Sequence, residues 1–230
     1  MGSFPGFSQE FFEFFTDLSR NNDRDWFAAN KDRYRAVVVD AISAFIGAMA
    51  PRLAEISRFY VADPRPNGGS MFRIYRDVRF SKDKRPYKEH AACQFRHQAG
   101  KDAHAPGFYV HLAPDKVIYG GGTWMPPGPD LQRIRQAIAD NPSAWSRVVE
   151  DNRLVDSFGA VAGEGLKRPP RGFPPDHPHI ADLKRKSFFA MRHVGADEAR
   201  SADFIDDVEV AFRSATPLMR FLCETLGAEF

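Results

Sequence analysis

The segment from Arg73 to Lys88 concentrates positive charge. It contains seven cations and two carboxylates, a local charge of +5, whereas the whole chain carries +2. Guanidinium and ammonium groups gathered in this way suit phosphate or carboxylate groups, which arginine binds with two hydrogen bonds at once. We therefore predict a binding or catalytic cleft for an anionic small molecule here. The residues expected to contact the ligand are Arg73, Arg76, Arg79, Lys84 and Lys88.

Three further side chains in and beside this segment could transfer protons. Asp77 lies among the arginines, and Tyr87 and His90 follow three residues apart. A carboxylate, a phenol and an imidazole held together can act as an acid–base set. The alternative is a structural His90 whose ring nitrogens are satisfied within the fold.

Residues 72–80 alternate between apolar and polar side chains, which predicts a strand with two distinct faces. One face places Asp77 between Arg73 and Arg79, where a carboxylate would stay ionised and orient a guanidinium. The other face surrounds Arg76 with Phe72, Ile74, Val78 and Phe80. An arginine in that setting must find a carboxylate or carbonyl partner, because burying it alone is costly. The pattern thus predicts a fixed arginine–aspartate network, serving either a ligand or only the fold.

The run of glycines at 120–122 is a second candidate for anion binding. Consecutive glycines let backbone N–H groups approach an anion closely, so Gly121 and Gly122 are assigned to the ligand site. The alternative is a bulge or bend in the chain, which is the commoner reason for unpatterned glycines. The run matches neither of the usual glycine-rich nucleotide-binding fingerprints.

The sequence predicts neither a metal site nor a cofactor. Asp176, His177 and His179 include metal-capable groups, but no third ligand completes them, and a loop tied by hydrogen bonds is the preferred interpretation. Cys93 and Cys223 form no redox or disulfide motif. Their number favours a reduced compartment, so we expect a cytoplasmic protein.

Two other classes of function stay open. Aromatic residues interleave the cations as stacking platforms for single-stranded nucleic acid would; they are Phe72, Tyr75, Phe80 and Tyr87. Against a nucleic-acid module, the chain outside the segment is net negative, so there is no broad basic face. The third class is an interaction protein in which the arginine–aspartate network is purely structural.

Hydrophobic periodicity orders the chain as helices, then strands, then helices with one late strand. We expect helix over 8–57, a sheet-rich part over 71–124, and helix with one strand over 128–228. The strand candidates are 71–80, 91–97, 107–112, 116–119 and 187–194. This order predicts an α+β fold with a mostly antiparallel sheet packed against N-terminal and C-terminal helices.

Length and composition agree with one soluble domain over residues 1–230. The 230 residues suffice for a sizeable core, which the 21 phenylalanines would fill. No signal peptide and no uninterrupted apolar stretch of membrane-spanning length is visible, so no membrane partner is expected. The sequence does not determine the oligomeric state.

The chain resembles the DUF2461 family (domain of unknown function 2461) over nearly its whole length. The residues that carry the resemblance are Trp26-Phe27 with Asn30 and Lys31, Arg73-x-x-Arg76-Asp77-x-Arg79-Phe80, Asp83-Lys84, Tyr87, the glycine run, Gly172-Phe173, Asp176-His177-Pro178 and Lys186. The resemblance implies an uncharacterised protein and carries no established activity or catalytic residues.

Overall fold

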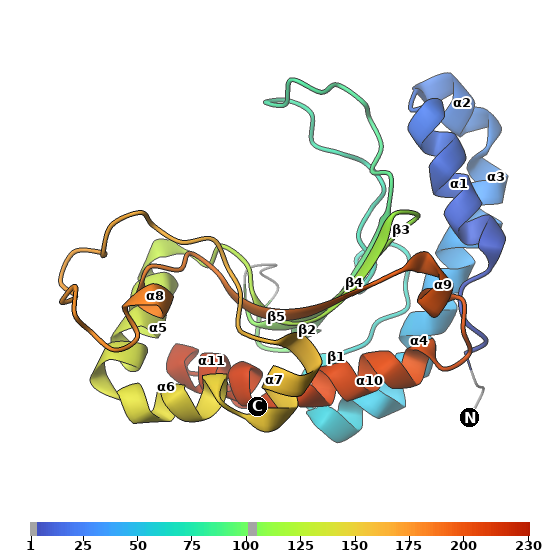
Figure 1. The fold of residues 1–230 in the computed structure, drawn as a ribbon. Helices are drawn as coiled ribbons and strands as arrows, with labels where there is room; N and C mark the ends of the chain where they lie inside the picture. The colour runs from blue at the N-terminus through green and yellow to red at the C-terminus, as the bar shows by residue number, and fades with distance from the viewer. Residues whose placement is uncertain (1–3, 101–104) are drawn as a thin grey trace.

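A five-stranded antiparallel sheet forms the floor of the molecule, with its strands in sequence order (Figure 1). The computed structural model describes residues 4–100 and 105–230. The strands are β1 (Tyr60–Val61), β2 (Ala91–His97), β3 (Gly107–Ala113), β4 (Lys116–Thr123) and β5 (Phe188–Val194). The α+β fold class is thereby confirmed.

Helices precede the sheet in the chain, connect β4 to β5, and follow β5. The N-terminal group is α1 (Gln9–Arg20), α2 (Arg24–Ala29), α3 (Lys31–Tyr34), the π-helix η1 (Arg35–Val39) and α4 (Asp40–Ile56). The later group is α5 (Gly128–Asp140), α6 (Pro142–Val149), α7 (Asn152–Phe158), α8 (Ile180–Leu183), α9 (Ala196–Ala199), α10 (Phe204–Ser214) and α11 (Thr216–Leu226). Ser8 caps α1 by accepting a hydrogen bond from the Phe11 N–H, and Asn141 caps α6 likewise.

One face of the sheet is covered by helices. Figure 1 shows α10 and α11 beneath the floor, and α4 also packs against β1 and β2. Along β3, every second side chain points to this covered face, so Phe108, Val110 and Leu112 are fully buried. Phe108 stacks on Phe212 of α10 with ring centroids 4.6 Å apart. Burial of these apolar side chains fixes the register of the sheet.

On the opposite face, which we call the open face, none of the described helices lies flat. In Figure 1 the helices α1–α3 rise at one end of the floor and α5, α6 and α8 lie at the other. The segment between β1 and β2 rises above the same face. The described elements above this face therefore stand at its margins.

The helical run Lys31–Ile56 is long and apolar enough to cross a membrane by length and composition alone, with a mean hydropathy of 1.6 in its best window. The core helix of a globular protein meets the same criteria. Here Ile42, Phe45 and Ile46 are fully buried in the main core. The packing supports a core helix.

The expected strand over 72–80 is wrong. Residues 72–90 instead form a projecting arm, which we call the basic arm. An isolated bridge between Met71 and Cys93 joins β2 just before the arm begins, and a second bridge, between Tyr75 and Tyr87, joins the two limbs of the arm to each other. A strand needs a continuous partner, and β2 pairs on that side with the short β1. The glycine run was expected after a strand, but it lies inside β4.

Candidate functional site

A pocket of about 540 Å³ opens on the open face of the sheet. Its lining comes from β2, β3, β4 and β5, from Phe72 at the base of the basic arm, and from Trp124 just after β4. The lining residues are Phe72, Gln94, Gly107, Tyr109, His111, Lys116, Ile118, Gly122, Thr123, Trp124, Phe189, Met191 and His193. Among these described residues there is a lysine and there are two histidines, but no carboxylate.

The period of two in the strands explains why these side chains meet. His111 on β3 pairs with Ile118 on β4, which pairs with His193 on β5. Residues directly opposite in neighbouring strands point to the same face, so the three form one row across the sheet. The pocket is consequently a property of strand register and is built on rigid elements.

Two histidines stack at this site. The rings of His90 and His111 lie 4.2 Å apart between centroids at an interplanar angle of 29°. The Tyr109 hydroxyl is 3.3 Å from Nδ1 of His111, within hydrogen-bond distance. The Nε2 of His111 is buried and has no hydrogen-bond partner among the residues that the structure describes.

The surroundings favour the uncharged form of both rings. Burial, then the neighbouring His111, Lys88 and Lys116, lower the pKa of His90 to about 4. Burial and then Lys116 lower the pKa of His111 to about 4, against a small opposing effect of Asp115. At neutral pH the pair is a stack of two neutral imidazoles beside cations.

Cations also surround Phe72 at the edge of the pocket. The Lys88 ammonium lies 5.5 Å and the Arg96 guanidinium 5.7 Å from the centre of its ring. The Lys88 ammonium donates a hydrogen bond of 2.7 Å to the Arg73 carbonyl. Burial, and then the charge of Arg73, lower the pKa of Lys88. Of the predicted ligand-binding cations, Lys88 is thus the one placed against a lining residue of the pocket.

Three arginines of the basic arm, Arg76, Arg79 and Arg85, pair with carboxylates of the arm itself. Arg79 donates hydrogen bonds of 2.9 and 2.7 Å to Asp77, and both side chains are exposed, at 77% and 61%. These bonds lower the pKa of the Asp77 carboxyl to about 2. The Lys84 ammonium donates to the Val78 carbonyl at 3.0 Å. An arginine–aspartate network is present, but its members are neighbours in sequence.

Arg76 does not lie on an apolar strand face as expected. Its guanidinium pairs with Asp83 at 2.8 Å, and Asp83 also pairs with Arg85 at 2.9 Å. Phe80, expected to share that apolar face, is 95% exposed. The alternation that predicted a two-faced strand reflects local ion pairs in an irregular loop.

The three predicted acid–base residues have different surroundings. Asp77 is exposed beside Arg79, Tyr87 is buried with its ring stacked 4.1 Å from Phe27, and His90 stacks on His111. Among the described residues, no hydrogen bond joins them into one set. The structure therefore places His90 alone beside the pocket.

The two predicted glycines lie on opposite faces of β4. A Cβ on Gly121 would come within 2.9 Å of the Met219 sulfur, in the core. Gly122 lines the pocket with φ +148°, and a Cβ there would lie 2.3 Å from the Phe188 carbonyl oxygen. Both glycines allow close packing inside the sheet.

Sequence reasoning missed most of the pocket, including Tyr109, Lys116, Trp124 and His193. His111 was likewise not assigned to a site from the sequence. The alternation of 107–112 is the signal that could have found Tyr109 and His111, because it places both on the polar face of a strand.

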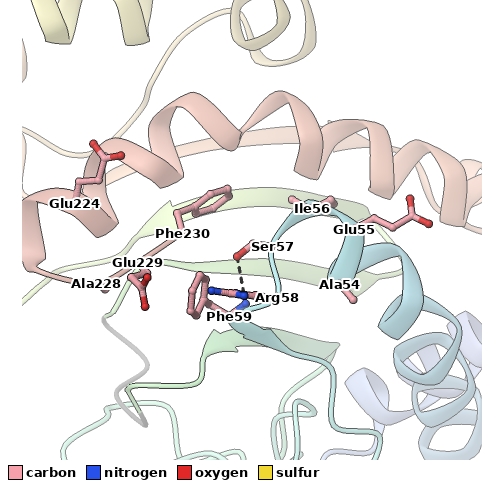
Figure 2. Close-up of a pocket in the computed structure, with 10 residues that line it drawn as sticks. All are labelled: Ala54, Glu55, Ile56, Ser57, Arg58, Phe59, Glu224, Ala228, Glu229 and Phe230. Carbon is pink, nitrogen blue, oxygen red and sulfur yellow. Dashed lines mark hydrogen bonds between the residues drawn. The ribbon is translucent and has the colours of Figure 1, made fainter.

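A second hollow, of about 670 Å³, lies between the end of α4 and the C-terminal residues (Figure 2). Arg58 lies over the ring of Phe59, and the Ser57 hydroxyl accepts a hydrogen bond from the Phe59 N–H, as Figure 2 shows. Its described lining contains three glutamates, Glu55, Glu224 and Glu229, against one arginine. This lining disfavours an anionic ligand.

Ser146, His179 and Asp182 have the composition of a catalytic triad. The Ser146 hydroxyl is 3.0 Å from Nε2 of His179, and Nδ1 of His179 is 3.7 Å from Asp182. The same Nε2 lies 3.1 Å from the Pro142 carbonyl oxygen, which can only accept. Nε2 is therefore a donor, unable to take a proton from Ser146, and the cluster ties α6 to α8.

The fold and pocket define a class: an α+β protein in which an antiparallel sheet carries helices on one face and a pocket on the other. The family model described as "Conserved hypothetical protein (DUF2461)" matches residues 10–221, so the chain belongs to that family. Among curated proteins, none matches the chain. Among the described residues, no group of three potential metal ligands comes together.

Proposed function

We propose that the pocket on the open face binds a small organic anion with an apolar or aromatic body. The observation that carries the proposal is the character of the lining. The lining places Lys116, two imidazoles, a phenol and an amide among apolar side chains. Its described residues include no carboxylate. Pockets of this kind combine an apolar surface with a few polar groups that orient the ligand.

Apolar and aromatic side chains in the lining of the pocket suit the body of such a ligand. Trp124 and Phe189 lie 5.6 Å apart between centroids, and Phe72 and Tyr109 lie 6.2 Å apart. Side chains of this type bind planar rings through stacking and edge contacts. They also exclude water, which strengthens the attraction between an anion and nearby cations.

The charge for an anionic group comes from Lys116 in the lining and from Lys88 and Arg96 beside Phe72. Of these three cations, only Lys88 was among the ligand-binding residues predicted from the sequence. Arg76, Arg79 and Arg85 of the basic arm pair with Asp77 and Asp83, so these three guanidinium groups are engaged within the arm.

The proposal is tested with benzenesulfonate, a permanently charged aromatic anion, and with neutral benzenesulfonamide of nearly the same shape. Calorimetric titration should show saturable binding of the sulfonate and at least tenfold weaker binding of the amide, a difference of about 1.4 kcal/mol. Lys116→Met should weaken sulfonate binding by about twofold to fivefold, because Lys116 is exposed and an exposed charge contact contributes up to about 1 kcal/mol.

Arg79→Met is the matched control, because it removes a cation of the basic arm that is exposed and paired with Asp77. It should leave sulfonate binding unchanged. Equal binding of sulfonate and amide, or loss of binding in Arg79→Met but not in Lys116→Met, would contradict the pocket as the anion site.

A further inference from the structure

The stacked histidines lie where a bound anion would act on them. His111 lines the pocket and His90 covers one side of its ring at 4.2 Å. In the free protein neither ring pairs with a carboxylate among the described residues. An imidazole in this position responds to any negative charge that enters the pocket.

The charged and titratable groups around the pair come from several elements. Lys88 of the basic arm and Lys116 at the start of β4 oppose protonation of the pair, and Asp115 in the β3–β4 turn favours it. Tyr109 on β3 stays protonated, since burial raises its pKa to about 12. His193 lies on β5 in the same row across the sheet. Glu89, next to His90 in the chain, is held by Arg85 and Asn22.

The hydrogen-bond inventory agrees with a neutral pair. A protonated imidazole has two N–H donors and needs two acceptors. His111 has the Tyr109 hydroxyl at Nδ1, while Nε2 is buried without a partner among the described residues. Charging His111 in the empty pocket would therefore leave a buried cation with an unsatisfied donor, within the field of Lys116.

We propose that the His90–His111 stack couples anion binding in this pocket to uptake of one proton. A bound anion supplies the negative charge that the free pocket lacks, so the complex holds a proton that the free protein does not. By linkage, the affinity for a permanently charged anion then rises as the pH falls. The inference rests on the proposed function, because it concerns the same pocket.

Benzenesulfonate is the probe, since its own charge is constant and any pH dependence belongs to the protein. Its affinity is measured by calorimetry between about pH 4.5 and about pH 8 in amine buffers, which do not compete as anions. Wild-type affinity should rise by up to about tenfold per unit decrease in pH over part of this range. Circular dichroism at each pH confirms that the protein remains folded.

His111→Gln is the test variant, because glutamine keeps hydrogen-bonding groups but cannot be protonated. It should still bind benzenesulfonate, with the pH slope largely removed. His193→Gln removes the other pocket imidazole and should retain the slope. Proton-resonance titration of the free wild-type protein should show His90 and His111 titrating near pH 4.

The outcomes separate this inference from the function on which it depends. Binding with an affinity independent of pH, or a slope lost in His193→Gln and kept in His111→Gln, overturns the proton coupling and leaves the anion pocket standing. Absence of benzenesulfonate binding at every pH overturns both.

Discussion

The two faces of one sheet carry opposite chemistry on alternate residues of the same strands. On β3, Phe108 and Val110 are fully buried against helices, whereas Tyr109 and His111, which alternate with them, face the pocket. The covered face supplies the apolar burial that fixes strand register. Because burial on the covered face fixes the strand register, the open face can hold polar and titratable groups that contribute little to the stability of the fold.

The largest effect should come from truncating the covered face. Phe108→Ala removes a fully buried ring that stacks on Phe212, so we expect a loss of about 3–5 kcal/mol in the free energy of unfolding. Ile118→Ala is the matched change on the open face, where the side chain is half-buried, and should cost less than half as much. Urea denaturation measures both. Equal losses would mean that the open face is part of the core.

An intermediate effect should come from the histidine pair, through the pH dependence of stability. The pKa values of His90 and His111 fall from 6.5 to about 4 on folding, so the unfolded chain binds more protons between these values. Stability is then complete above pH 6.5 and decreases as the pH falls toward 4. Discounted for solvent screening, we expect a loss on the order of 1 kcal/mol.

His111→Gln removes one of these titrations. Urea denaturation across the same pH interval should show a flatter pH dependence for the variant than for the wild type. A steeper dependence in the variant would mean that His111 is protonated in the folded state. Phe108→Ala should keep the wild-type slope, which would separate a titrating group of the open face from general destabilisation.

The paired strands were predictable because their signals are local. The strand over 91–97 and the hairpin around Pro114 follow from alternation and a turn, and the structure confirms both as β2 and as β3–β4. The expected strand over 72–80 failed because alternation does not supply a partner. There, short-range pairs such as Asp77–Arg79 satisfy the charges without a sheet.

The pocket was harder to predict than the fold. Its residues come from four strands and two loops, and what unites them is register, which pairs His111 with Ile118 and Ile118 with His193. Nothing in the local sequence around Lys116 or His193 indicates a common site. We predicted the site in the basic arm instead, because its charge is concentrated in sequence. A linear sequence shows local charge but not which distant side chains line one pocket.

The smallest effect should come from the basic arm, the region that the sequence made most conspicuous. Arg79→Ala breaks an ion pair whose two members are exposed at 77% and 61%. Exposed pairs contribute little, because water and salt screen them and ordering the side chains costs entropy. We expect the melting temperature to stay within about 2 °C of wild type.

Arg76→Ala sharpens the comparison within the arm. Its guanidinium is 27% exposed and bonds both Asp83 and the Arg85 carbonyl, so its loss should lower the melting temperature more than loss of Arg79. If Arg79→Ala instead unfolded the protein, the arm would be an essential part of the fold. The purely structural network would then explain its charge better than a ligand does.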